Sequence, residues 1–149
     1  LEGWVDVYMP DFKLWQQAES ERLLGASDYP ERARAALEEM QRQVGPLCVD
    51  SEGLAARGLM VRHLVLPGLV EQSLAILRWL AELHPQTYVN VMGQYHPAHE
   101  VSWRGPVGEA EEVAYAEIAR LPTQREVEDV RREARRLGLR LDGETERRA

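Results

Sequence analysis

The stretch "LMVRHLVL", residues 59–66, is apolar at every position except Arg62 and His63, and Pro67 and Gly68 follow it. A short run of this kind, apolar on both faces, is typical of a parallel strand buried on both sides. Two more runs have the same character, "WVDVYM" (4–9) and "TYVNVM" (87–92). The sequence therefore predicts three buried strands.

Helical periodicity separates and follows these runs. Apolar residues recur at helical spacing in four segments, which are residues 30–45, 71–83, 109–120 and 123–138. The last segment opens with Thr123 and Glu126, the spacing of a capping box, and stops at Gly138. "LRL" (139–141) is a candidate final strand.

The alternation of strands and helices predicts an α/β fold of consecutive parallel βα units. We expect a single domain over residues 1–149, with a frayed tail at 143–149. The segment around Glu52 and Gly53 is expected to be a small turn excursion within this domain.

Composition narrows the class of protein. With 44% apolar and 29% charged residues, the chain fits a soluble globular protein, and we expect it in the cytoplasm. The net charge of −7 argues against nucleic-acid binding, and no apolar run is long enough for a bilayer. Cys48 is the only cysteine, which excludes a disulfide framework or a metal site made of cysteines alone.

Ligands of parallel α/β folds sit at the carboxyl ends of the strands. The first predicted strand leaves Asp11 and Lys13 there, and Lys13 is the only lysine in the chain. The second strand carries Arg62. The third strand leaves several polar residues, which are Asn90, Gln94, Tyr95 and His96.

Arg62 is the most informative of these residues, because a buried guanidinium needs an anionic partner. Two interpretations stay open: an internal pair with Asp6 or Asp11, or a ligand carboxylate or phosphate gripped by the planar group. His63 points to the opposite face and is expected to be a packed, hydrogen-bonded residue under a helix.

The other polar residues also have two interpretations. Asp11 and Lys13 share a face of an extended chain, either as a surface ion pair of little energetic value or as ligand contacts. His96 and His99 make a weak metal pair, because Pro97 prevents a regular helix. A hydrogen bond from His96 to a ligand is the more plausible role, and we predict no metal site.

Four stretches together resemble a known family: "YMPDFK" (8–13), "YPERARAALEEMQRQVG" (29–45), "RGLMVRHLVLPG" (57–68) and "VMGQYHPAH" (91–99). They are similar, in order and spacing, to the C-terminal part of radical S-adenosylmethionine proteins. The nearest resemblance is to relatives of the pyruvate formate-lyase activating enzymes. It implies the C-terminal half of a partial (β/α)6, TIM-like barrel.

The resemblance implies a cofactor site. Asp11 and Lys13 would contact the methionine or ribose part of S-adenosylmethionine, Arg62 its carboxylate and ribose, and His96 its adenosine. In such enzymes a [4Fe–4S] cluster, held by three cysteines spaced Cys-x3-Cys-x2-Cys, cleaves the cofactor reductively. The resulting 5′-deoxyadenosyl radical abstracts a hydrogen. No such cysteine motif is present here, so the ligands of the cluster would lie outside this chain.

We therefore expect a part of a radical S-adenosylmethionine enzyme that is inactive on its own. The partner implied is a glycyl radical enzyme or another protein substrate, and the sequence leaves the hydrogen donor open. The first strand would lack its neighbour, so self-association through that edge is expected. The alternative is a non-catalytic α/β ligand-binding or scaffold domain whose polar residues pair internally.

Overall fold

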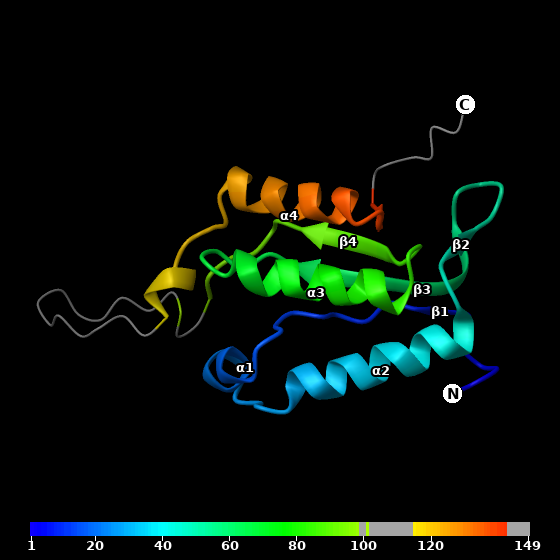
Figure 1. Cartoon of the computed structure of the whole chain (residues 1–149), viewed down its shortest axis with the longest axis horizontal. Helices are drawn as coiled ribbons and strands as arrows, with labels where there is room; N and C mark the ends of the chain where they lie inside the picture. The colour runs from blue at the N-terminus through cyan, green and yellow to red at the C-terminus, as the bar shows by residue number, and fades with distance from the viewer. Residues whose placement is uncertain (99–100, 102–114, 143–149) are drawn as a thin grey trace, which may run out of the picture.

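The computed structural model describes residues 1–98, 101 and 115–142. Its main sheet has the strand order β1-β3-β4-β5, in which every neighbouring pair is parallel. The strands are β1 (Val7–Tyr8), β3 (Ala55–Leu64), β4 (Tyr88–Met92) and β5 (Arg140–Leu141). A parallel sheet with alternating helices confirms the α/β class (Figure 1).

Three helices cover the sheet, and the sequence analysis found each of them: α2 (Tyr29–Val44), α3 (Val70–Leu83) and α4 (Gln124–Arg136). The capping box of α4 is present, with Thr123 and Glu126 bonded reciprocally. A further helix, α1 (Gln17–Leu24), was not predicted. It ends at Gly25, whose φ of 64° lies in the left-handed region that glycine adopts without strain.

The excursion around Glu52 and Gly53 is a hairpin. β2 (Cys48–Val49) runs antiparallel to the start of β3, and Asp50 closes the turn by accepting hydrogen bonds from the amides of Glu52 and Leu54. This strand adds to β3 off the main path of the sheet. The excursion is thus joined to the sheet through β3.

Two predicted elements differ from the structure. The predicted first strand (4–9) shortens to β1, and Trp4 is 89% exposed. Residues 109–114 of the predicted third helix, His99 and the 143–149 tail lie outside the described residues. Within 115–120 only a 3-10 turn, η2 (Ala116–Ile118), forms, and Tyr115 before it has a φ of 71°, so the predicted helix does not run through Tyr115.

The largest correction concerns burial of the strands. Leu59, Val61 and Val65 are fully buried, whereas Met60, Leu64 and Leu66, which alternate with them, are only half-buried. β4 repeats this alternation. A single core joins the buried strand residues to residues of all three covering helices, among them Leu37, Ile76 and Val130. The helices thus lie on one face of the sheet, and the prediction of two-sided burial was wrong.

We call the other side the open face; it carries Met60, Arg62, Leu64, Leu66, Tyr88, Asn90 and Met92. Its apolar side chains explain why the sequence imitates a strand buried on both sides.

Within the described residues, no helix is long and apolar enough to cross a membrane.

His63 occupies the covered face and is completely buried, as its position in the sequence suggested. Burial lowers the pKa of its imidazole, while the bond to the carbonyl of Phe12 opposes that shift. The unfolded chain therefore binds a proton near pH 6.5 that the folded chain rejects. Stability that His63 provides is present above about pH 6.5 and is lost as the pH falls.

We predict that the free energy of unfolding falls with acidification below about pH 6.5, by at most about 1.4 kcal/mol per pH unit from this residue. Urea titrations at several pH values measure the slope. His63→Asn should flatten it, because the buried ring that rejects the proton is then absent. Equal slopes in the wild type and His63→Asn would rule out this origin.

Glu126 ties the start of α4 to the loop after β3. Its carboxylate accepts hydrogen bonds from the amides of Gly68 and Thr123, both at 2.7 Å, and pairs with Arg120 at 2.8 Å. The hydrogen bond from Arg120 is the main cause that lowers the pKa of the carboxyl, which stays ionised at neutral pH. One side chain thus holds two loops together.

We predict that Glu126→Ala lowers the free energy of unfolding by about 1.5–3 kcal/mol, because it leaves charged and backbone donors without their acceptor. The matched control is Glu128→Ala on the same helix, where an exposed pair with Arg135 is lost and the change should stay within about 0.5 kcal/mol. Equal effects of the two substitutions in urea unfolding would contradict the assigned role.

Candidate functional site

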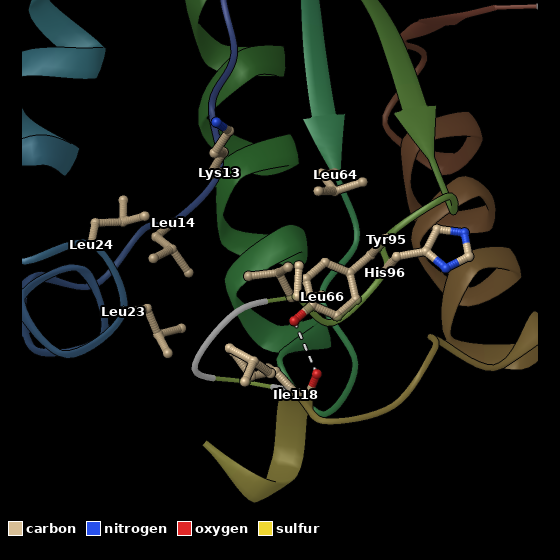
Figure 2. A pocket seen from close by; sticks show the side chains of 11 residues that line it. Lys13, Leu14, Leu23, Leu24, Leu64, Leu66, Tyr95, His96 and Ile118 are labelled. Atoms are coloured by element: carbon tan, nitrogen blue, oxygen red, sulfur yellow. Dashed lines mark hydrogen bonds between the residues drawn. The ribbon is translucent and has the colours of Figure 1, made fainter. Parts of the chain in front are cut away.

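The carboxyl ends of β1, β3 and β4 meet around a cavity of about 300 Å³. Figure 2 shows its lining, which comes from the loop after β1, from α1, from the ends of β3 and β4, and from η2. The lining residues are Lys13, Leu14, Leu23, Leu24, Leu64, Leu66, Tyr95, His96, Ala98, Val101 and Ile118. The cavity therefore lies at the edge of the sheet where ligands of parallel folds are found.

An acid and two bases gather beside this cavity. The Nε atom of Arg62 lies 2.7 Å from Oδ1 of Asp11, and Nζ of Lys13 lies 3.4 Å from Oδ2 of the same carboxylate. The internal Arg62–Asp11 pair, one of the two interpretations of the sequence, is thus what the structure shows. The cluster keeps one excess positive charge.

Backbone register explains this grouping. Val7 and Tyr8 pair with Gly58 and Leu59, and the same parallel alignment continues past Pro10 to a bridge between Asp11 and Arg62. Asp11 and Arg62 therefore share the open face, and Lys13, two residues on, lies on the side of Asp11. Phe12 points the other way, into the core.

The pKa of the Asp11 carboxyl lies below its usual range. Partial burial alone would raise it, but the hydrogen bond from Arg62 and the charge of Lys13 outweigh burial. Asp11 is therefore ionised at neutral pH. It fixes the two cations and is not suited to the role of a proton donor at that pH.

Arg62 retains hydrogen-bonding capacity. Its only side-chain hydrogen bond uses Nε, and neither Nη atom has a partner within the described part of the chain. Its side chain is 40% exposed, so solvent reaches the guanidinium and no external anion is needed to compensate burial. The premise that Arg62 is buried on both sides was wrong, although both Nη groups have no partner among the described residues.

Asn90 is the neighbour of Arg62 on β4, and the two are direct partners in the parallel register. The side-chain amide of Asn90 makes no hydrogen bond to the described residues. The sequence placed Asn90 near the strand end without giving it a role. Parallel register is the signal that identifies it, because partners across a ladder share a face.

His96 stands apart from the charged cluster. It lines the cavity together with Lys13, but Figure 2 shows the two residues on different sides of the lining, and His96 makes no hydrogen bond to the described residues. The structure thus brings Asp11, Lys13 and Arg62 together, and it connects His96 to them only through the cavity.

The lower wall of the cavity comes from Tyr95, from η2 and from α1, and of these segments the sequence analysis missed α1. The hydroxyl of Tyr95 donates a 2.9 Å hydrogen bond to the carbonyl of Ile118, which holds η2 against the extension of β4 (Figure 2). Arg22 of α1 pairs with Glu117 of η2 at 2.6 Å. Leu23 and Leu24 of α1 then close the apolar side.

The residues present do not fit an iron–sulfur cluster. Cys48 lies on β2 and pairs with Arg57 in the first half of β3, away from the end that carries the cavity. Within the described residues, no group of three or more histidine, cysteine and acidic side chains is arranged to hold a metal ion. Such a cluster requires three thiolate ligands from elsewhere.

Comparison of the chain with protein-family models gives no match, and comparisons with curated proteins and with solved structures give none either. Function is therefore inferred from the residues and their geometry.

Proposed function

We propose that this chain forms the cofactor-binding C-terminal half of a partial (β/α)6 barrel in a radical S-adenosylmethionine enzyme. The observation that carries the proposal is the gathering of Asp11, Lys13 and Arg62 on the open face, next to a cavity at the carboxyl ends of the strands. These are three of the residues that the resemblance assigns to the cofactor.

One-sided helix cover supports the barrel. In a (β/α) barrel all helices pack outside, and the inner faces of the strands meet one another across the interior. A doubly wound sheet would have helices on both faces. Here α2, α3 and α4 share one face, and Met60, Leu64 and Met92 line the other. In the proposal, the open face is the inner wall of the barrel.

The residues fit part of a site for S-adenosylmethionine. The free Nη atoms of Arg62 and the neighbouring amide of Asn90 suit a carboxylate, and Lys13 supplies a compact ammonium near the rim. His96 offers a ring nitrogen to the adenosine. When bound, the cofactor supplies a carbon-centred radical for hydrogen abstraction; this chain's residues bind and orient it and exclude water.

The complete enzyme requires cluster ligands from outside this chain. A glycyl radical enzyme, or another protein substrate, is the partner that the resemblance suggests. β1 lies at one edge of the main sheet in the described structure, and its outer side is where a preceding strand of the barrel would pair. Self-association through that edge in the isolated chain remains a prediction.

The short Arg62–Asp11 contact favours a second candidate, a non-catalytic ligand-binding domain whose charges pair internally. Such a domain would use the apolar cavity without S-adenosylmethionine. Affinity for S-adenosylmethionine separates the two candidates.

We predict that Arg62→Ala weakens binding of S-adenosylmethionine by about 10- to 150-fold, since a charge-assisted hydrogen bond contributes about 1.5–3 kcal/mol. Calorimetric titration of the chain measures this. The matched control is Arg32→Ala, which removes an exposed arginine from α2 and should bind as the wild type does. Unchanged affinity in Arg62→Ala would refute the assignment of Arg62.

We also predict that the chain alone produces no 5′-deoxyadenosine, because one thiol does not hold a cluster. The experiment is anaerobic reconstitution with iron and sulfide, followed by iron counting and a turnover assay with dithionite. The wild type should match a Cys48→Ala control in both readouts. About four irons per chain, or turnover above the control, would show that the ligand assignment is wrong.

A further inference from the structure

The backbone of residues 11–13 is held by side chains from the covering layer. Tyr29, the first residue of α2, places its hydroxyl between two backbone groups. That oxygen accepts a 2.9 Å hydrogen bond from the amide of Lys13 and donates a 3.3 Å bond to the carbonyl of Asp11. One phenol thus spans the extended segment of residues 11–13 and fixes the residues that carry the charged cluster.

His63 of β3 holds the same extended segment from another side. Its Nδ1 lies 2.7 Å from the carbonyl oxygen of Phe12, and its Nε2 lies 2.8 Å from Oγ of Ser73 on α3. Because a carbonyl only accepts, Nδ1 must carry the proton, and Nε2 then accepts from the hydroxyl of Ser73. The ring is completely buried, so both bonds are shielded from water.

Gln72 of α3 secures the next residues. Its Oε1 accepts hydrogen bonds from the amides of Trp15 and Gln16, at 2.9 and 2.8 Å. The ring of Phe12 packs edge-on against those of Tyr29 and Trp79, with centroids 6.4 and 5.8 Å apart. The segment after β1 is therefore ordered without belonging to a helix or a longer strand.

We propose that Tyr29 and His63 are positioning residues, which lock the extended segment of residues 11–13 so that Asp11 and Lys13 face Arg62. As far as the ligand is concerned, this inference rests on the proposed function. The Lys13 side chain makes no ion pair or hydrogen bond with the described residues other than that with Asp11, and it is 44% exposed. The ammonium of Lys13 is directed by its own backbone and by the carboxylate of Asp11, and the hydrogen bonds to residues 11–13 hold both in place.

The arrangement differs from ordinary core packing. An apolar residue at position 29 or 63 would fill the same space, but it would release the carbonyl of Asp11 or of Phe12 and the amide of Lys13. All three groups belong to residues 11–13. The hydroxyl of Tyr29 and Nδ1 of His63 are thus directed at the segment that presents the charged cluster.

The test follows the carboxyl carbon of Asp11 by NMR as the pH is lowered, in the full chain. In the wild type the midpoint of the Asp11 titration should lie below 3.8, the ordinary pKa of an aspartate carboxyl. Tyr29→Phe and His63→Leu should move it up toward that value, because Arg62 and Lys13 then no longer face the carboxylate. His63→Asn retains a donor for the carbonyl of Phe12 and should restore the wild-type midpoint.

Tyr8→Phe is the matched control. It removes a tyrosine hydroxyl that donates to Gln43 of the same helix at 2.7 Å, and no hydrogen bond to residues 11–13 is lost with it. The titration midpoint of Asp11 in Tyr8→Phe should equal that of the wild type. A midpoint in Tyr29→Phe that stays at the wild-type value would overturn the proposal. If His63→Leu does not fold, Tyr29→Phe alone decides.

Affinity for S-adenosylmethionine gives a second readout. Tyr29→Phe should weaken binding at least about threefold while Tyr8→Phe leaves it unchanged; equal affinities would overturn the positioning role toward the ligand. A wild-type chain that does not bind S-adenosylmethionine would refute the proposed function instead. The midpoint of Asp11 would still decide whether Tyr29 and His63 position the cluster.

Discussion

The parallel register between β3 and the segment of residues 7–12 is the constraint on which the candidate site depends. The amide of Arg62 donates to the carbonyl of Pro10, and the amide of Phe12 donates to the carbonyl of Arg62. A shift of one residue would turn Asp11 into the core and Phe12 onto the open face. The burial of Phe12 opposes such a shift, so a hydrophobic side chain fixes where two charged ones point.

One-sided cover is the second organising feature. The same strands present Leu59, Val61 and Val65 to the helices and Met60, Arg62 and Leu64 to the open face. Charged and apolar groups thus alternate along one wall, with solvent access at the cluster. This access lets Arg62 pair with Asp11 and still keep two Nη groups that have no partner in the described part of the chain, which a closed interior would penalise.

The order of the elements could be predicted from the sequence because periodicity and capping residues are local signals. The capping box of α4 and the turn at Gly53 are examples. The uncovered side of β3 could not be predicted from the sequence. Met60, Leu64 and Leu66 are apolar, so the pattern predicts burial whether or not a second layer of helices covers that face. α1 escaped notice because its residues are mostly polar. The hydrogen bonds that Tyr29 and Gln72 make with the segment after β1 join residues distant in the sequence, so no local pattern reveals them.

The central claim is that the open face beside the cavity binds S-adenosylmethionine. The most direct measurement is an NMR titration of the isotopically labelled chain with S-adenosylmethionine, with S-adenosylhomocysteine as a second ligand that lacks the sulfonium charge. The account predicts that shift changes concentrate at residues 11–13, Arg62, Asn90 and His96. Absence of any shift change, or changes confined to residues remote from the cavity such as those of the β2 hairpin, would contradict it.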